Sequence, residues 1–268
     1  MPHNGVMTEI FRRPQLAQEM ARQLLKPSAL DLGLRSGMFM FGPHRSGKTT
    51  FLIQDLAPAL EEGGALVIYV NLCCSPQRSS KDMVLDAIRE TLSNRGSEAP
   101  GAKLDIGLKN LGIAGGATIA EVLKSQVDQA KADVVLIIDE VQEAASTLDG
   151  QQMLLALKAA RDAINTRLVT PGHFLLIGVC SNQAASIEMT TAESQAFAGA
   201  ANMPYPFLER DYVEFLLERL QQEGHCNLPT VEIAEQLFRA ANSNPDELTR
   251  ALVQLQRSVT TGSSSDDL

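Results

Sequence analysis

Residues 42 to 49 read GPHRSGKT, between the apolar stretch GMFMF at Gly37–Phe41 and the helical pattern TTFLIQDLAPAL at residues 49–60. The eight residues fit the pattern G-x-x-x-x-G-K-[ST]. Glycines in such a loop let backbone N–H groups turn inward around phosphate oxygens, because no Cβ stands in the way. The pattern is specific only where a strand precedes it and a helix follows. The stretch therefore predicts an α/β fold built around a phosphate-binding loop.

The side chains of this loop predict ATP and Mg²⁺ as cofactors. Lys48 is expected to reach the β- and γ-phosphates, and Thr49 to offer its hydroxyl to Mg²⁺. The N-terminus of the following helix adds the positive end of its dipole. The residues expected to hold the nucleotide are Gly42, Pro43, His44, Arg45, Ser46, Gly47, Lys48, Thr49 and Thr50.

Short apolar runs alternate with longer helical patterns, which is typical of βαβ units and a parallel sheet. Near-continuous apolarity in the middle runs indicates strands covered on both faces. Strands are expected at Gly37–Phe41, Ala65–Leu72, Val134–Ile138, Phe174–Val179 and Met203–Phe207. Helices are expected at Pro14–Leu25, Lys48–Leu60, Ser80–Leu92, Ile119–Lys131 and Gln151–Arg167. The predicted fold class is α/β, a P-loop NTPase sheet of about five parallel strands flanked by helices.

Only helical patterns follow the last expected strand. Thr230 can cap a helix that carries Ile233 and Leu237, and Asn244-Pro245 can start a final helix. These patterns predict a small C-terminal helical lid. The expected domains are an N-terminal segment at 1–13, a P-loop ATPase core at 14–208, a helical lid at 209–258 and a disordered tail at 259–268.

One part of the core departs from the alternating pattern. Asn94–Ala102 is rich in Gly, Ser and Pro and is expected to be an exposed loop. Leu104–Ala117 has apolar residues without a clean period. We therefore expect an insertion of unassigned shape at about residues 94–118.

The run Val134–Ile138 ends in two adjacent carboxylates, Asp139 and Glu140. Acidic side chains are seldom buried unless they are paired or coordinate a metal. Asp139 is expected to hold Mg²⁺, directly or through water, and Glu140 to activate the attacking water as general base. The alternative, a strand end that turns into a solvated helix start, is weakened by the phosphate loop, because both motifs would meet across one Mg·ATP.

Three motifs together carry a family resemblance. Phe11-Arg12-Arg13, the loop GPHRSGKT and the sequence DEVQ at Asp139–Gln142 resemble the AAA+/STAND-type ATPases that are often called archaeal-ATPase-like. The resemblance covers residues 10 to 257, although only the motifs are specific. It implies a five-strand parallel sheet, a helical lid, and ATP-driven switching or remodelling of partners.

The resemblance also implies a sensor residue after the strand at Phe174–Val179. In the family, a polar residue at this place senses the γ-phosphate and helps to position water. Asn182 matches that role best and would be a catalytic residue together with Glu140 and Lys48, with Ser181 as the second choice. The alternative for both is an ordinary polar turn at a strand end.

Arginines are missing from the places where the resemblance expects them. Ala196–Asn202 contains none, and Asp246 follows Asn244-Pro245 where the lid motif commonly carries an arginine. Arg239 and Arg250 could approach the phosphates, but neither occupies the family position. An arginine finger changes turnover by about 10³–10⁵. We therefore expect slow hydrolysis by the lone chain, with a homo-oligomer or a protein partner supplying the missing charge.

Four basic side chains besides Lys48 belong to these motifs. His44 and Arg45 are expected to be solvent-facing spacers, and the alternative for Arg45 is a contact with a neighbouring subunit. Arg12 and Arg13 could line the adenine side of the site, as the resemblance implies, or form a solvated basic pair.

Composition narrows the class of partner and the location. The chain has 268 residues, 44% of them hydrophobic, with a formal net charge of -9. The net negative charge disfavours nucleic acid as a partner without excluding it. It also disfavours binding to a membrane surface. No apolar run approaches the ~20 residues of a membrane span, and the N-terminus lacks the order of a secretory signal, so we expect a cytoplasmic protein. The four cysteines have no metal-ligand spacing and are expected to be small buried residues.

Three functions are compatible with this sequence. The first is a hydrolytic ATPase whose turnover rearranges a partner, favoured by Lys48, Thr49, Asp139 and Glu140. The second is a nucleotide-operated switch in which hydrolysis is incidental, favoured by the missing arginines. The third is a DNA-processing accessory ATPase for transposition or defence, which the acidic charge disfavours.

Overall fold

A computed structural model describes residues 10–35, 37–74, 77–98, 119–191 and 195–262. The expected insertion segment Leu104–Ala117 and the end of the expected tail lie outside these residues. The chain divides into two compact units. The described parts of residues 14–42 and 49–205 form the first, which we call the sheet unit, and those of residues 1–13, 43–48 and 206–268 form the second, which we call the lid unit.

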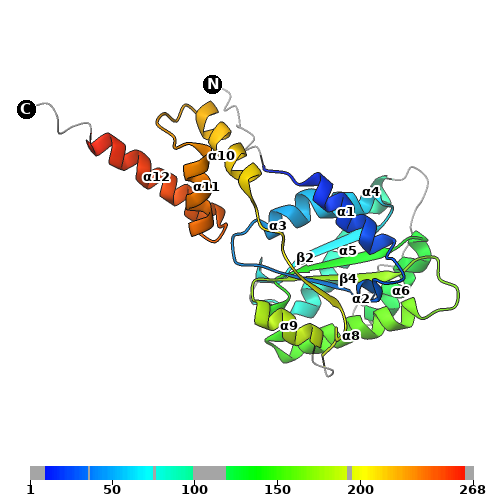
Figure 1. Cartoon of the computed structure of the whole chain (residues 1–268). Helices are drawn as coiled ribbons and strands as arrows, with labels where there is room; N and C mark the ends of the chain where they lie inside the picture. The colour runs from blue at the N-terminus through cyan, green and yellow to red at the C-terminus, as the bar shows by residue number, and fades with distance from the viewer. Residues whose placement is uncertain (1–9, 36, 75–76, 99–118, 192–194, 263–268) are drawn as a thin grey trace, which may run out of the picture. The chain divides into compact units, whose positions relative to one another are not determined.

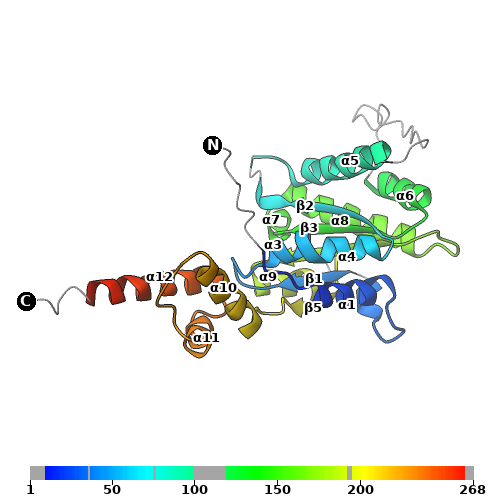
Figure 2. The same cartoon turned by 90° about the horizontal axis from the view of Figure 1, so that it is seen from above.

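The sheet unit is built on five parallel strands in the order β2-β3-β4-β1-β5. Figures 1 and 2 show this sheet with helices on both of its faces. The strands are β1 (Met38–Phe41), β2 (Leu66–Asn71), β3 (Val134–Asp139), β4 (Phe174–Cys180) and β5 (Ala201–Pro204). The predicted fold class is therefore confirmed, and each expected strand exists, with its ends shifted by at most three residues.

The strand order places the two sequence motifs on strands that are not neighbours. The phosphate loop follows β1 and the acidic pair follows β3, and β4 lies between them in the sheet. Because all five strands are parallel, their carboxyl ends meet at one edge. That edge is where the expected site residues of the sheet unit gather.

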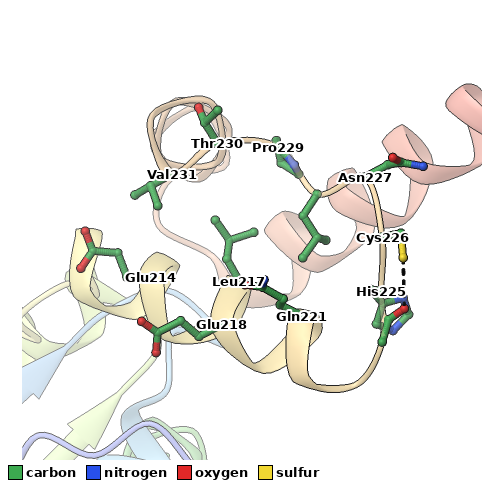
Figure 3. Close-up of a pocket in the computed structure, with 12 residues that line it drawn as sticks. Glu214, Leu217, Glu218, Gln221, His225, Cys226, Asn227, Pro229, Thr230 and Val231 are labelled. Carbon is green, nitrogen blue, oxygen red and sulfur yellow. Dashed lines mark hydrogen bonds between the residues drawn. The ribbon is translucent and has the colours of Figure 1, made fainter.

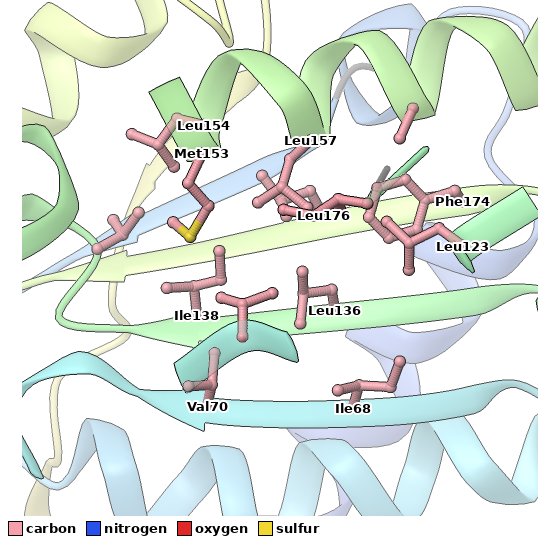
Figure 4. Packing of buried hydrophobic residues seen from close by; sticks show 14 of the residues in the cluster. Ile68, Val70, Leu123, Leu136, Ile138, Met153, Leu154, Leu157, Phe174 and Leu176 are labelled. Carbon is pink, nitrogen blue, oxygen red and sulfur yellow. The ribbon is translucent and has the colours of Figure 1, made fainter. Parts of the chain in front are cut away.

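Both faces of the sheet are buried, because residues alternate between two apolar clusters along β2 and β3. One cluster contains Ile68 and Leu136 with side chains from helices on the same face, and Figure 4 shows Leu123, Leu154 and Leu157 packed there. The other contains Val135 and Ile137 with residues from α1 (Pro14–Leu25) and the helix after the phosphate loop. Continuous apolar strands of this kind are required when helices cover both faces.

The helices of the sheet unit connect these strands. They are α1 (Pro14–Leu25), α2 (Leu32–Arg35), α3 (Lys48–Phe51), α4 (Ala57–Glu62), α5 (Ser80–Glu98), α6 (Ile119–Ala130), α7 (Gln142–Ala145), α8 (Leu148–Asn165) and α9 (Gln183–Thr191). A π-helical turn, η1 (Leu52–Leu56), joins α3 to α4, and a short 3₁₀ turn, η2 (Leu72–Cys74), follows β2.

The expected helix Lys48–Leu60 is interrupted by the π-helical turn. The N–H of Ala57 donates to the carbonyl of Leu52, one residue further back than in an α-helix. Pro58, which follows Ala57, has no N–H for the α-helical ladder. The extra residue in this turn offsets that missing donor, so the helix continues after it.

Two other expected boundaries are wrong. Residues 94–98 of the expected loop are the last turn of α5. The helix expected from Gln151 begins at Leu148, because the hydroxyl of Thr147 accepts from the N–H of Gly150 at 3.1 Å and caps it. Gly150 fits inside the first turn because a Cβ there would meet the carbonyl oxygen of Ala144 at 2.2 Å.

The lid unit has three helices and its own apolar core in its described part. They are α10 (Arg210–Gln222), α11 (Val231–Ala240) and α12 (Pro245–Gly262). Thr230 caps α11 as expected, but Ile233 is 49% exposed and Ala234 and Phe238 fill the core instead. The expected tail starts too early, since α12 continues to Gly262.

Two further observations concern the whole described chain. The expectation of buried cysteines holds only for Cys180, because Cys73, Cys74 and Cys226 are exposed. No helix in the described part of the chain combines the length and the hydropathy that a membrane span requires.

We expect Leu157→Ala to lower the free energy of unfolding by about 2–5 kcal/mol, because it leaves a cavity in the core beneath α8. Leu157 is 0% exposed, whereas Leu155 on the same helix is 50% exposed. Leu155→Ala is therefore the matched control and should cost less than about 1 kcal/mol. Urea denaturation followed by circular dichroism measures both, and equal losses would contradict this description of the core.

Candidate functional site at the carboxyl edge of the sheet

The phosphate loop leaves β1 at Gly42, whose N–H donates to the carbonyl of Cys180 at the end of β4 at 3.2 Å. Gly47 has a φ of 88° and Arg45 a φ of 61°, both in the left-handed region. Glycine adopts this region without steric cost, which explains why position 47 is a glycine. Of the remaining loop residues, Pro43 and His44 are exposed, as are Thr49 and Thr50 at the start of α3.

Two polar side chains of the loop are buried. The ammonium of Lys48, which is 5% exposed, donates to the carbonyl of Pro43 at 2.7 Å. The hydroxyl of Ser46, which is 2% exposed, has no hydrogen-bond partner among the described residues. A buried hydroxyl without a partner costs free energy, so a ligand that accepts from Ser46 would recover it.

The carboxylate of Asp139 is 0% exposed and receives four hydrogen bonds. The hydroxyl of Thr49 donates to Oδ2 at 2.6 Å, which joins the start of α3 to the end of β3. Tyr69 and Asn71 of β2 donate to the same oxygen at 3.1 and 3.2 Å, and the N–H of Glu140 donates to Oδ1 at 3.1 Å. All four donors are neutral groups.

This network follows from the register of the strands. Asn71 is the direct partner of Asp139 across the β2–β3 ladder, and Tyr69 lies two residues earlier on the same face. Burial and the charge of Asp139 raise the pKa of Tyr69 well above its usual value. A tyrosine phenol is already protonated at neutral pH, and the raised pKa leaves Tyr69 a donor to the carboxylate.

Glu140 follows with a φ of 55°, which is uncommon for a residue other than glycine. Two donors from different elements reach the same carboxylate oxygen, Oε2. The hydroxyl of Ser181, after β4, donates at 2.5 Å, and the side-chain amide of Gln142, at the start of α7, donates at 2.5 Å.

Asn182 makes different hydrogen bonds from Ser181. Its side-chain oxygen accepts from the N–H of Ala184 at 2.9 Å and of Ala185 at 3.3 Å, so it caps α9. The structure thus brings Ser181, the second choice for the sensor, to Glu140. The sensor role of Asn182 stays a prediction.

The arginines that the sequence placed near the nucleotide or at a subunit contact form ion pairs or backbone contacts within the lid unit. Arg45 pairs with Asp246 at 2.7 Å, Arg250 with Glu247 at 2.7 Å and Arg239 with Glu235 at 2.5 Å. Arg13 donates to the carbonyls of Pro206 and Phe207 at 2.6 and 3.3 Å. Arg45 is exposed as expected, but it is ion-paired rather than only solvated.

A separate hollow of about 700 Å³ lies in the lid unit between α10 and the start of α11. Figure 3 shows Leu217 pointing into it, with Glu214 and Glu218 along α10. None of the expected nucleotide-site residues lines this hollow. It therefore does not belong to the candidate site.

The sequence predicted no role in the site for three of its side chains. Tyr69 and Asn71 are polar residues at alternate positions in an otherwise apolar strand, which is a signal that could have found them. Gln142 was noticed only as part of the sequence DEVQ. Its contact with Glu140 depends on the turn after β3, which the pattern does not reveal.

A comparison with models of known protein families gave a match over most of the chain. The model of a family described as "ATPase domain predominantly from Archaea" matches the chain over residues 27–251. A search of curated proteins found no match.

Two solved structures illustrate the likeness in fold. The Walker-type ATPase PABY2304 of Pyrococcus abyssi has a TM-score of 0.60 at 14% identity, over 96% of this chain and 75% of that one. The ORC2 protein of Aeropyrum pernix, in ADPNP–ADP complexes, has a TM-score of 0.56 at 18% identity, over 98% of this chain and 66% of that one. At these identities the likeness shows the fold alone.

The family match spans most of the chain, includes the loop at Gly42–Thr49 and the acidic pair after β3, and agrees with the parallel sheet. The chain belongs to the family of ATPase domains found predominantly in archaea.

Proposed function

We propose that this chain binds ATP with Mg²⁺ and hydrolyses it, and that the nucleotide state sets the conformation of a protein partner. The observation that carries the proposal is the 2.6 Å hydrogen bond from Thr49 to Asp139. It joins the residue that ends the phosphate loop to the acid that ends β3. Two motifs 90 residues apart in sequence therefore serve one site.

The residues at this point fit a magnesium ion. Asp139 is a buried carboxylate that forms no ion pair among the described residues, and a buried charge without an opposite charge is costly. No group of three or more His, Cys, Asp or Glu in the described chain could hold a metal ion. Mg²⁺ needs no such group, because it binds through one or two carboxylates, waters and substrate phosphates. Bound there through Thr49 and Asp139, it would neutralise charge on the phosphate oxygens.

Glu140 is proposed as the general base. Its carboxylate takes a proton from a water molecule as the water oxygen bonds to the γ-phosphorus and the bond to the β-phosphate oxygen breaks. ADP leaves with that electron pair. Lys48, one residue before Thr49 in the chain, contributes positive charge to the phosphates, and the backbone N–H groups of the loop bind their oxygens.

Turnover by the lone chain is proposed to be slow. Arg239 and Arg250 are exposed and form ion pairs with glutamates of their own helices. An arginine supplied by a second copy or another protein would raise the rate by about 10³–10⁵. This proposal explains why the chain would act together with a partner.

A second candidate is a nucleotide-operated switch, which one observation favours. Arg45 of the phosphate loop pairs with Asp246 in the first turn of α12, within the lid unit. Phosphates bound at the loop would compete with Asp246 for Arg45, so nucleotide occupancy would change a lid contact. Phosphate release at steady state separates the two candidates, because a switch needs no turnover.

We expect Glu140→Gln to lower the kcat for ATP hydrolysis by about 10²–10⁴, because an amide cannot take the proton from water. Nucleotide affinity should stay within about threefold of the wild type. Phosphate release measures the first and fluorescent-nucleotide titration the second. Glu143→Gln, on the exposed side of α7, is the control and should keep the wild-type rate. Equal turnover in wild type and Glu140→Gln would overturn the enzymatic proposal and favour the switch.

We expect Asp139→Asn to remove the part of ATP-dependent stabilisation that needs Mg²⁺, because a neutral amide does not hold the cation. A ligand at about 100 times its Kd raises the free energy of unfolding by about 2.7 kcal/mol. Thermal unfolding of each variant with ATP, before and after addition of Mg²⁺, gives the increment in stability that Mg²⁺ adds. Asp133→Asn, at the opposite end of β3, should keep it. An undiminished Mg²⁺ increment in Asp139→Asn would count against this metal site.

Ser46→Ala should leave the free energy of unfolding of the nucleotide-free protein unchanged or raise it, because its hydroxyl has no partner to lose and its burial without one is costly. Ser186 is the matched control, since it is 0% exposed and its hydroxyl donates to Asn202 at 3.0 Å. Ser186→Ala should cost about 1–3 kcal/mol. Chemical denaturation measures both. A loss at Ser46 as large as at Ser186 would show that its hydroxyl is already satisfied without nucleotide.

A further inference from the structure

Gln142 is one of the residues of the site to which the proposed mechanism gives no role. It is the first residue of α7 and lies two residues after Glu140. Its amide nitrogen donates to Oε2 of Glu140 at 2.5 Å. The orientation of the amide is determined by chemistry, because a carboxylate only accepts and the NH₂ end must therefore face it.

We propose that Gln142 is a positioning residue, which holds the Glu140 carboxylate in the orientation that accepts a proton from water. The inference rests on the proposed hydrolysis of ATP. It assigns to Gln142 no contact with the nucleotide, only an effect through Glu140.

Two donors converge on one oxygen of Glu140. Ser181 after β4 and Gln142 on α7 both donate to Oε2 at 2.5 Å. The terminal torsion of a glutamate is broad and roughly two-fold, so an unrestrained carboxylate samples many orientations. Donors held by two separate elements restrict this torsion far more than one would.

The backbone at Glu140 has an uncommon conformation. Its φ of 55° lies in the left-handed region, and the next N–H, of Val141, donates to the carbonyl of Val179 at 2.9 Å. The chain thus turns sharply between Asp139 and Val141 while both stay against β4. Uncommon backbone conformations persist where the surroundings over-determine them, and they cluster at active sites.

Stability of the fold does not explain a glutamine at position 142. The other end of its amide, Oε1, is buried and has no hydrogen-bond partner in the described part of the chain. A buried acceptor without a partner is destabilising, and a methionine of similar length would avoid that cost. A residue that is unfavourable for folding and contacts the general base fits a role in catalysis better than a role in packing.

The test compares Gln142→Met, which keeps the length and removes the amide, with Gln142→Glu, which replaces the donor by a second carboxylate. Both variants should lower kcat by about 10–100-fold, because misplacement of a catalytic group by about 1 Å costs about that much. The KM for ATP and the affinity for nucleotide should stay within about twofold. The thermal midpoint of Gln142→Met should equal or exceed that of the wild type.

A second measurement separates positioning from a general structural effect. In the Glu140→Gln background, Gln142→Met should cause no further loss of rate, since residues that act as a unit are not additive. A structural effect would lower the rate by the same factor in both backgrounds. Glu143→Gln on the same helix is the control and should keep the wild-type kcat.

Each outcome has one meaning. Wild-type turnover that Glu140→Gln abolishes, with Gln142→Met as active as the wild type, overturns the role of Gln142 and leaves the proposed function standing. Equal rates in wild type and Glu140→Gln overturn the proposed function and the inference with it. A loss in Gln142→Met that comes with weaker nucleotide binding or a lower thermal midpoint also contradicts positioning.

Discussion

The hydrogen bond between Thr49 and the buried carboxylate of Asp139 is the contact on which the rest of the site depends. It joins the helix that follows the phosphate loop to the strand that carries the acidic pair. Asp139 has no exposed surface, and all its hydrogen-bond donors are neutral, so its charge is held without a cation from the described chain. A buried acid of this kind is costly unless a ligand cation completes it. This cost is the physical reason why we propose a cation site at Asp139.

The sheet topology explains how the surrounding residues reach Asp139. β2 lies beside β3 and places Asn71 directly opposite it, whereas β4 on the other side ends at Ser181, which reaches Glu140. A parallel sheet brings these strand ends to one edge although the residues lie far apart in sequence. The two carboxylates thus receive different partners. Asp139 is held by β2 and α3, and Glu140 by β4 and α7.

The fold and the two main motifs could be predicted from the sequence, because they depend on local patterns. Continuous apolar runs predicted the strands, and the loop and the acidic pair predicted which strand ends matter. The contacts that the sequence did not predict depend on non-local geometry. Tyr69, Asn71 and Gln142 contact the carboxylates only through strand order and the turn after β3, which no local period encodes. The π-helical turn was missed although Pro58 marks it, and the cysteines were assigned by residue type rather than by place.

The most direct measurement is a crystal structure of the chain with a non-hydrolysable ATP analogue and Mn²⁺, in which anomalous scattering locates the metal. We expect one metal bound to the hydroxyl of Thr49, next to Asp139, with the phosphates enclosed by the backbone of Gly42–Thr49. Water-mediated contact with Asp139 would agree as well as direct contact. A metal bound away from both residues, or phosphates outside the loop, would contradict the account.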